Sequence, residues 1–245
     1  MRSMNILLLR PEERIDAQHW RIRGTRFRHI TTLLERRVGD ALRAGILDGK
    51  LGSATITEID PTAEQLLVSF TEEEEEEPPA ALPLKLILAL PRPKMLKRVL
   101  IDASSLGIKQ IVLLNSWKVD KSYWQTPHLK ADLLREKLLL GLEQAMDTTL
   151  PELILAPRFK PFVEDQLASF CLSSRKIMAH PGDFPPLPHD ISEPVTLAVG
   201  PEGGWTEYEK DMFESQGFEC HALGQRILRV ETALPTLVGR MMRLI

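Results

Sequence analysis

A glycine-rich turn, Gly200-Pro201-Glu202-Gly203-Gly204-Trp205, follows the apolar segment 195–199. Three glycines in five residues let the backbone turn sharply and approach a ligand closely. Thr206 begins the next segment, and Glu209 three residues later completes a capping box that is typical of a helix start. The turn lacks the Gly-Lys-Ser/Thr of a triphosphate loop and the spacing of a dinucleotide fingerprint. It therefore predicts either a ligand-binding turn or a plain tight connection between a strand and a helix.

A second unusual segment runs from Leu223 to Ala233 and reads Leu-Gly-Gln-Arg-Ile-Leu-Arg-Val-Glu-Thr-Ala. Arg226 and Arg229 flank an apolar pair, so alternate side chains can face an apolar pocket and solvent. Glu231 would lie at the start of the last helix, where the helix dipole favours a carboxylate. The arginines could instead pair with surface carboxylates, but two such segments in one chain favour a ligand pocket.

The segments that must position these residues alternate between strands and helices after residue 83. Strands are expected at 84–90, 110–115, 153–156, 176–179, 195–199 and 219–222, and helices at 94–106, 128–146, 162–170, 206–216 and 232–244. Buried strands that alternate with helices predict a parallel sheet covered on both faces. Ligands of such sheets lie beyond the carboxyl ends of the strands. This rule indicates the residues that follow Leu114, Val199 and Leu223.

The chain before residue 72 is different, with short β-like segments at 5–9, 41–47, 53–59 and 65–70 and one helical stretch at 26–35. About seventy residues of this kind fit a small, mostly antiparallel barrel. Six consecutive glutamates at 72–77 and three prolines by residue 83 then predict an exposed linker, although the acidic run could have a function of its own. The expected domains are therefore 1–71 and 84–245, joined by a linker at 72–83.

The net charge of −3 hides a strong asymmetry along the chain. Residues 1–50 hold ten Arg and one Lys against six acidic residues, whereas residues 51–77 hold nine acidic residues and no basic one. A concentrated basic face is what phosphate binding requires, although a solvated arginine-rich surface is the alternative. The residues expected to contact a nucleic acid on this face are Arg21, Arg23, Arg26, Arg28, His29 and Arg36.

Several classes of protein are excluded by composition. No apolar run approaches the roughly 20 residues that span a bilayer, and the start of the chain does not resemble a secretory signal. The two cysteines, Cys171 and Cys220, form neither a disulfide framework nor a metal-ligand set. No Gly-x-Ser-x-Gly elbow or metal-binding helix motif indicates a hydrolase. We expect a cytoplasmic protein without membrane or metal partners.

Together, the Gly200–Gly204 turn and the Leu223–Ala233 segment resemble those of the bacterial small-subunit ribosomal RNA uridine-N3 methyltransferases, of the SPOUT class. The two motifs stand in that family's order and at its separation. The similarity extends over most of the chain, with further matches at Arg26-Phe27-Arg28-His29-Ile30, Leu33-Leu34, Gly39-Asp40, Lys94, Leu106-Gly107-Ile108 and Glu143-Gln144.

The resemblance implies a PUA-like β-barrel followed by an α/β domain with a parallel sheet and a C-terminal deep trefoil knot. It also implies a homodimer that acts on the small ribosomal subunit and methylates a uridine of 16S ribosomal RNA at ring nitrogen 3. S-adenosylmethionine would lie among three loops. The residues implied to hold it are Leu114, Asn115, Val199, Gly200, Gly203, Gly204, Leu223, Gly224, Ile227, Leu228, Thr232 and Ala233.

The chemistry assigns roles to three side chains. The uracil nitrogen is a weak acid that must lose its proton while it is held in line with the methyl group. We expect Arg226 or Arg229 to stabilise the negative charge that develops on the uracil, or to grip a phosphate. Glu202 would position the substrate or act as base, and a structural role for it is the alternative.

The sequence departs from the family pattern at Glu35, at Asp102-Ala103-Ser104-Ser105 and at Asp147-Thr148-Thr149. These positions fall in the parts expected to contact RNA or to support them, whereas the cofactor segments are intact. Two further interpretations therefore stay open: a catalytically silent relative that binds RNA during ribosome assembly, and a knotted dimerisation or regulatory module without RNA.

Overall fold

A computed structural model of the chain describes residues 5–72 and 77–243, so residues 73–76 of the expected linker lie outside the described part. Contacts divide the chain into two compact units. The first comprises Met1–Ala80 together with Leu142–Leu150, and the second comprises Ala81–Gly141 and Pro151–Ile245. The first unit therefore takes in a short segment from the middle of the chain.

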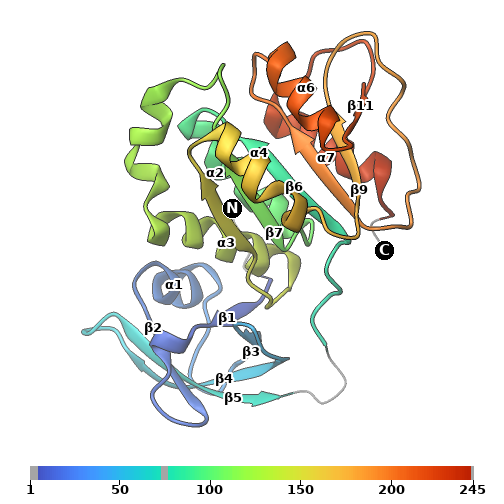
Figure 1. Cartoon of the computed structure of the whole chain (residues 1–245). Coiled ribbons are helices and arrows are strands. Elements are labelled where there is room, and N and C mark those ends of the chain that lie inside the picture. Colours follow the sequence, from blue (N-terminus) through green and yellow to red (C-terminus); the bar gives the residue numbers. More distant parts are fainter. Residues whose placement is uncertain (1–4, 73–76, 244–245) are drawn as a thin grey trace. The chain divides into compact units, whose positions relative to one another are not determined.

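The first unit is built on a five-stranded sheet in the order β1-β3-β4-β5-β2 (Figure 1). Its strands are β1 (Leu7–Leu9), β2 (His19–Arg23), β3 (Ala41–Ile46), β4 (Leu51–Asp60) and β5 (Gln65–Glu72). All neighbours are antiparallel except β1 and β3. Because β1 and β2 stay at opposite edges of the described sheet, it is a curled half-barrel where we expected a barrel.

The half-barrel closes over an apolar core that includes Trp20, Phe27 and Ile30. The helix expected at 26–35 begins and ends two residues earlier and is irregular, with α1 (Gly24–Arg28) running into a π-helical turn, η2 (His29–Leu33). Strand β2 was not predicted. Its alternating polar residues face outward while Trp20 and Ile22 are buried, so only two apolar residues mark it in the sequence.

The second unit contains a six-stranded sheet in the order β11-β9-β10-β6-β7-β8, and every neighbouring pair is parallel. Its strands are β6 (Leu84–Ala89), β7 (Gln110–Leu114), β8 (Glu152–Ala156), β9 (Arg175–Ala179), β10 (Val195–Val199) and β11 (Glu219–His221). All six lie where the sequence placed them. The prediction of a buried parallel sheet is confirmed.

Figure 1 shows helices on both faces of this sheet. They are α2 (Pro93–Ser105), α3 (Ala131–Ala145), α4 (Phe159–Asp165), α5 (Leu167–Phe170), α6 (Glu207–Ser215) and α7 (Val230–Met241). Helix α2 packs on α7, and α4 meets α6 through the edge-on rings of Phe159 and Phe213, whose centroids are 5.5 Å apart. The helix predicted at 162–170 is two short helices, because Gln166 leaves the helical conformation (φ −120°, ψ −30°).

Short 3-10 turns complete the structure: η1 (Pro11–Glu13) in the first unit, and η3 (Lys121–Gln125) and η4 (Pro127–Leu129) in the second. Turns η3 and η4 lie between β7 and α3, so they follow the carboxyl end of a strand. That placement brings them to the edge of the sheet at which ligands of parallel sheets bind.

Candidate functional site

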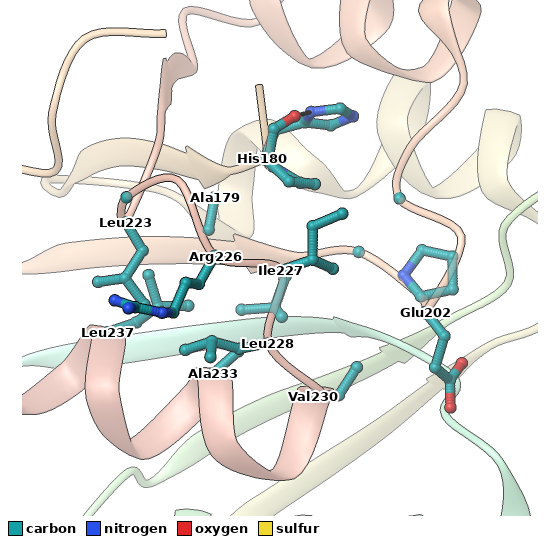
Figure 2. Close-up of a pocket in the computed structure, with 16 residues that line it drawn as sticks. Ala179, His180, Glu202, Leu223, Arg226, Ile227, Leu228, Val230, Ala233 and Leu237 are labelled. Atoms are coloured by element: carbon teal, nitrogen blue, oxygen red, sulfur yellow. Dashed lines mark hydrogen bonds between the residues drawn. The ribbon is translucent and has the colours of Figure 1, made fainter. Parts of the chain in front are cut away.

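A cavity of about 650 Å³, part of it open to solvent, lies at the carboxyl ends of β9, β10 and β11. The turn after β10 and the segment from Leu223 to Leu228 form its walls, and the start of α7 closes it from below in the view of Figure 2. The edge of the sheet and two of the three predicted loops are thus brought together at one place.

The turn after β10 requires glycine at two positions. Gly204 has a φ of +69°, a left-handed conformation that costs other residues free energy, and its N–H donates to the carbonyl of Pro201 at 2.8 Å. A Cβ atom at Gly200 would lie 3.2 Å from Nε1 of Trp205, whose indole is buried. A side chain at Gly200 would crowd Trp205, and one at Gly204 would lie 3.3 Å from Nε2 of His180, so both positions favour glycine.

The predicted capping box at the start of α6 is confirmed and has a further role. The Thr206 hydroxyl accepts from the Glu209 N–H at 3.2 Å, and the Glu209 carboxylate accepts from the Thr206 N–H at 2.8 Å. The same buried carboxylate accepts from the N–H of Trp117 at 2.8 Å. Glu209 thereby ties the loop after β7 to the turn after β10.

The segment from Gly224 to Leu228 leaves its backbone open to a ligand. Within the described chain, none of its five N–H groups donates to a protein acceptor. The Ile227 side chain is 79% exposed and points toward His180 in Figure 2. An exposed apolar side chain beside unused backbone donors is what a site for a ligand with both apolar and polar parts requires.

The cavity brings together eight of the twelve residues expected to hold a cofactor: Val199, Gly200, Gly204, Leu223, Gly224, Ile227, Leu228 and Ala233. The other four, Leu114, Asn115, Gly203 and Thr232, do not line it.

Two of these four have contacts that explain their position. The Asn115 side-chain oxygen accepts from Nε1 of Trp124 at 2.8 Å. The carbonyl of Gly203 accepts from Nζ of Lys118 at 2.7 Å, so this glycine faces the loop after β7. Both residues are thus engaged with the chain that follows β7 and not with the cavity.

Sequence reasoning missed six lining residues, namely Ala179, His180, Pro181, Pro201, Val230 and Leu237. Ala179 and His180 stand at the carboxyl end of β9, which the strand-end rule could have identified once the strand order was known. The His180 ring has Nδ1 2.6 Å from the carbonyl oxygen of Pro181 and Nε2 3.5 Å from that of Trp205. These contacts hold the ring at the rim of the cavity.

The three side chains expected to do chemistry occupy different places. Arg226 lines the cavity beside Leu237, on the side away from Glu202 (Figure 2). Glu202 lies 3.8 Å from Nε of Arg92, and its side chain is 32% exposed. Arg229 lines a neighbouring cleft instead, and Glu202 borders both spaces. Glu202 and Arg229 therefore share one cleft, whereas Arg226 lies apart from them.

The residues expected to contact RNA in the first unit differ in their availability. Arg26 is largely buried and donates to both carboxylate oxygens of Glu13 at 3.2 Å. Arg23 donates to the Gln65 side chain, and exposed Arg28 lies 3.7 Å from Glu64. Arg21 and His29 are partly buried, whereas Arg36 is exposed. RNA contact by this set stays a prediction.

Two kinds of feature are absent from the residues that the structure describes. No group of three or more His, Cys, Asp or Glu side chains there could hold a metal ion. Nor is any helix in that part of the chain long and apolar enough to cross a membrane.

Comparison with known proteins places the chain. Residues 78–242 match the RNA methyltransferase domain family. The chain is 33% identical over 239 residues to the ribosomal RNA small subunit methyltransferase E of Treponema pallidum, covering 94% of this chain and 87% of that protein. It is 27% identical over 241 residues to the enzyme of the same name from Synechocystis, covering 94% and 74%.

Solved structures show the same fold. The small subunit methyltransferase E of Neisseria gonorrhoeae bound to S-adenosyl methionine superposes with a TM-score of 0.74, at 21% identity, over 96% of each chain. A putative methyltransferase from Legionella pneumophila, in complex with the same cofactor, gives 0.72 at 23% identity over 94% of each chain. The SPOUT-type α/β fold with its N-terminal half-barrel is thereby confirmed, while the knot stays a prediction. The chain belongs to the family of ribosomal RNA small subunit methyltransferases E.

Proposed function

We propose that this chain transfers the methyl group of S-adenosylmethionine to ring nitrogen 3 of a uridine in 16S ribosomal RNA. The observation that carries the proposal is the cavity at the ends of β9, β10 and β11, where unused backbone donors meet apolar walls in a member of an RNA methyltransferase family.

The cavity fits a cofactor of this kind. Leu223, Leu228 and Leu237 offer apolar contacts for a purine ring, and the N–H groups of residues 224–228 are available to polar atoms. When bound, the donor supplies an activated methyl group, so the protein must chiefly bind, orient and control a proton.

Arg229 and Glu202 are the side chains best placed to act on the uridine, because they border one cleft beside the cavity. The Arg229 guanidinium would stabilise the negative charge on the uracil as its nitrogen loses a proton. Glu202 would accept or orient that proton, with Arg92 holding the carboxylate in place. Arg226 lies across the cavity and would contact the donor or an RNA phosphate.

The proposed assembly is a homodimer that acts on the small ribosomal subunit in the cytoplasm. Ile227 is an apolar side chain left 79% exposed at the mouth of the cavity, so a partner subunit or the substrate would bury it. The resemblance to the family, which extends over most of the chain, supports the same homodimeric assembly.

Calorimetry with S-adenosylmethionine tests the donor site, and two glycine variants sharpen the test. Gly204→Ala puts a Cβ 3.3 Å from Nε2 of His180 at the cavity, whereas Gly217→Ala puts one 4.0 Å from Lys176 Nζ, outside it. Both glycines have positive φ, +69° and +84°, so both variants carry a similar backbone strain of about 1–2 kcal/mol. Donor affinity should fall roughly tenfold in the first variant and stay unchanged in the second.

Small ribosomal subunits that lack modification then test the reaction. Incubation with the wild-type chain and donor should give a new N3-methyluridine in 16S RNA, detected by mass spectrometry of the digested nucleosides. Donor binding with methylation of another base would reject the uridine assignment. A chain that binds the RNA but not the donor would be the catalytically silent relative.

A further inference from the structure

A second cleft lies at the point where the strand order of the sheet reverses. From β6 the chain moves outward to β7 and β8, and it then returns to build β9, β10 and β11 on the other side of β6. Strands β6 and β10 are neighbours, and Arg92 and Glu202, which follow them, both line this cleft. Open parallel sheets bind their ligands at such reversal points. The donor cavity lies next to it, toward β9 and β11.

The cleft shares lining residues with spaces on both sides. It shares Glu202 with the donor cavity, and it shares Lys94 and His128 with an apolar groove between α2 and α3. Leucines of both helices line the groove, and Lys97 borders it. Including their open mouths, the cleft and the groove enclose about 1400 and 850 Å³. We call the cleft and the groove together the α2 track.

Cations along the α2 track are available to a ligand. In the described part of the chain, no carboxylate lies within ion-pair distance of Lys94, Lys97 or Arg229. Lys94 and Lys97 are exposed on the first turns of α2, and their spacing of three residues places them next to each other on one face of the helix. Unpaired cations beside an apolar floor suit a polyanion that also carries flat, apolar groups.

Tyr123 offers an aromatic ring to such a ligand from a well-supported turn. It is half-buried at the wall of the cleft, within η3. The Asp120 carboxylate accepts from the Ser122 N–H at 2.8 Å at the start of this turn, and Trp124 donates to the Asn115 side chain at 2.8 Å. Both neighbours of Tyr123 are thereby held by hydrogen bonds, which limits the movement of the backbone on either side of the ring.

We propose that a single-stranded segment of the substrate RNA lies in the α2 track, with the target uridine in the cleft, its base against Tyr123, and flanking phosphates on Lys94 and Lys97. This inference rests on the proposed function and adds the substrate-binding residues of the second unit. Proteins hold single strands in this way, with cations along the backbone and aromatic rings against splayed-out bases.

Salt dependence of RNA binding tests the lysines. The affinity of the full-length chain for an oligouridylate is measured at several salt concentrations for the wild type, Lys94→Ala and Lys97→Ala. A variant that no longer touches one phosphate of a single strand should have a slope of log affinity against log salt that is smaller by about 0.7. Lys160→Ala is the matched control, because Lys160 is an exposed lysine of the same unit, paired with Glu164 and outside the track. Its slope should equal that of the wild type.

Substitutions of Tyr123 test the stacking contact. Tyr123→Ala should weaken oligouridylate binding roughly 5- to 100-fold, whereas Tyr123→Phe should retain it, since the aromatic face is kept. Donor affinity, measured by calorimetry, should be the same in all of these variants, which also shows that they are folded.

The outcomes separate this inference from the proposed function. If the wild type methylates small subunits but Lys94→Ala and Lys97→Ala keep the slope of Lys160→Ala, the RNA does not follow the α2 track and the inference is overturned. A wild type without methyl transfer overturns the function, while the slopes still decide the track. Photo-crosslinks from RNA that contains 4-thiouridine should fall in residues 92–97 or 121–128. Crosslinks confined to residues 1–50 would contradict the proposal. An amphipathic peptide that binds the groove, where RNA does not, would contradict it as well.

Discussion

The cations of the two units differ in what they are free to do. Arg26 belongs to the arginine-rich first fifty residues, yet its side chain is only 14% exposed and donates to Glu13 and to the carbonyl of Leu8. Lys94 and Lys97 lie in a stretch that is also basic, since residues 84–109 hold six basic residues and one acidic residue, but both lysines are exposed and have no carboxylate partner among the described residues. The comparison teaches that, in two regions with an excess of positive charge, pairing and burial decide which cations can meet a nucleic acid.

The first unit uses part of its positive charge for its own packing. Arg10 and Arg26 lie 3.7 and 4.0 Å from the Glu143 carboxylate, which arrives on the segment Leu142–Leu150. The planar guanidinium of arginine can satisfy several acceptors at once, as Arg26 does here. The number of arginines in residues 1–50 is therefore larger than the number of arginine side chains that this unit can offer to RNA.

The largest effect is expected at Arg229, which has no carboxylate partner among the described residues and lines the cleft proposed to hold the uridine. Arg229→Ala should lower single-turnover methyl transfer about 100-fold, because removing a group that stabilises developing charge typically costs that much. Donor affinity, measured by calorimetry, should not change, since Arg229 lies outside the donor cavity. Arg175→Ala, which removes an arginine paired with Glu219 away from the site, is the control. A turnover equal to that of the control would remove Arg229 from the mechanism.

A paired arginine should affect stability instead. Arg26→Ala leaves Glu13 without its cation and Glu143 with Arg10 alone in a largely buried place, so we expect the free energy of unfolding to fall by about 2–3 kcal/mol. Chemical denaturation of the full chain measures this change. Arg36→Ala, at an exposed position, should stay within about 0.5 kcal/mol of the wild type. Equal losses in the two variants would erase the contrast between paired and free arginines.

Exposed arginines of the first unit should act on RNA binding with smaller effects. Arg28→Ala and Arg36→Ala should each lower the salt slope of binding to small ribosomal subunits by about 0.7 to 1, if each side chain meets one phosphate. RNA binding would cost Arg28 only its exposed ion pair with Glu64, and exposed ion pairs contribute little to the free energy of folding. Slopes that match the wild type in both variants would leave RNA binding to the second unit alone.

The smallest expected effect is on the pH dependence of stability, through the cluster that Arg10, Arg26 and Glu143 form. Burial raises the pKa of Glu143 above its ordinary value, against the pull of Arg26 and Arg10. Since the folded state then holds this proton more tightly than the unfolded state, the carboxyl group favours folding less as pH rises from the ordinary value through the raised pKa.

Glu143→Gln removes this titration while it keeps the shape of the side chain. The variant should match the wild type at low pH and become relatively more stable as pH rises through that window, in denaturation curves taken at several pH values. A difference that is constant with pH would show that Glu143 does not titrate there.

Sequence reasoning succeeded where the signal is local. Strand β10 was predicted with its observed bounds because four apolar residues and Thr196 precede a glycine turn, and the capping box of Thr206 and Glu209 marked the next helix. It failed where the signal depends on neighbours in space. Nothing local to Glu209 shows that its carboxylate also holds the Trp117 N–H, 92 residues away in the chain.

The sequence by itself determined the alternation of strands and helices, the glycine positions of the turn at residues 200–204, and the family, because periodicity, capping and conformational freedom are properties of short segments. Only the tertiary structure decided that Leu142–Leu150 joins the first unit, that Arg26 is taken up by internal pairing, and that Arg92, Glu202 and Arg229 meet at one cleft. These outcomes depend on which strands become neighbours and which side chains lose water, and both are set by contacts between residues far apart in the chain.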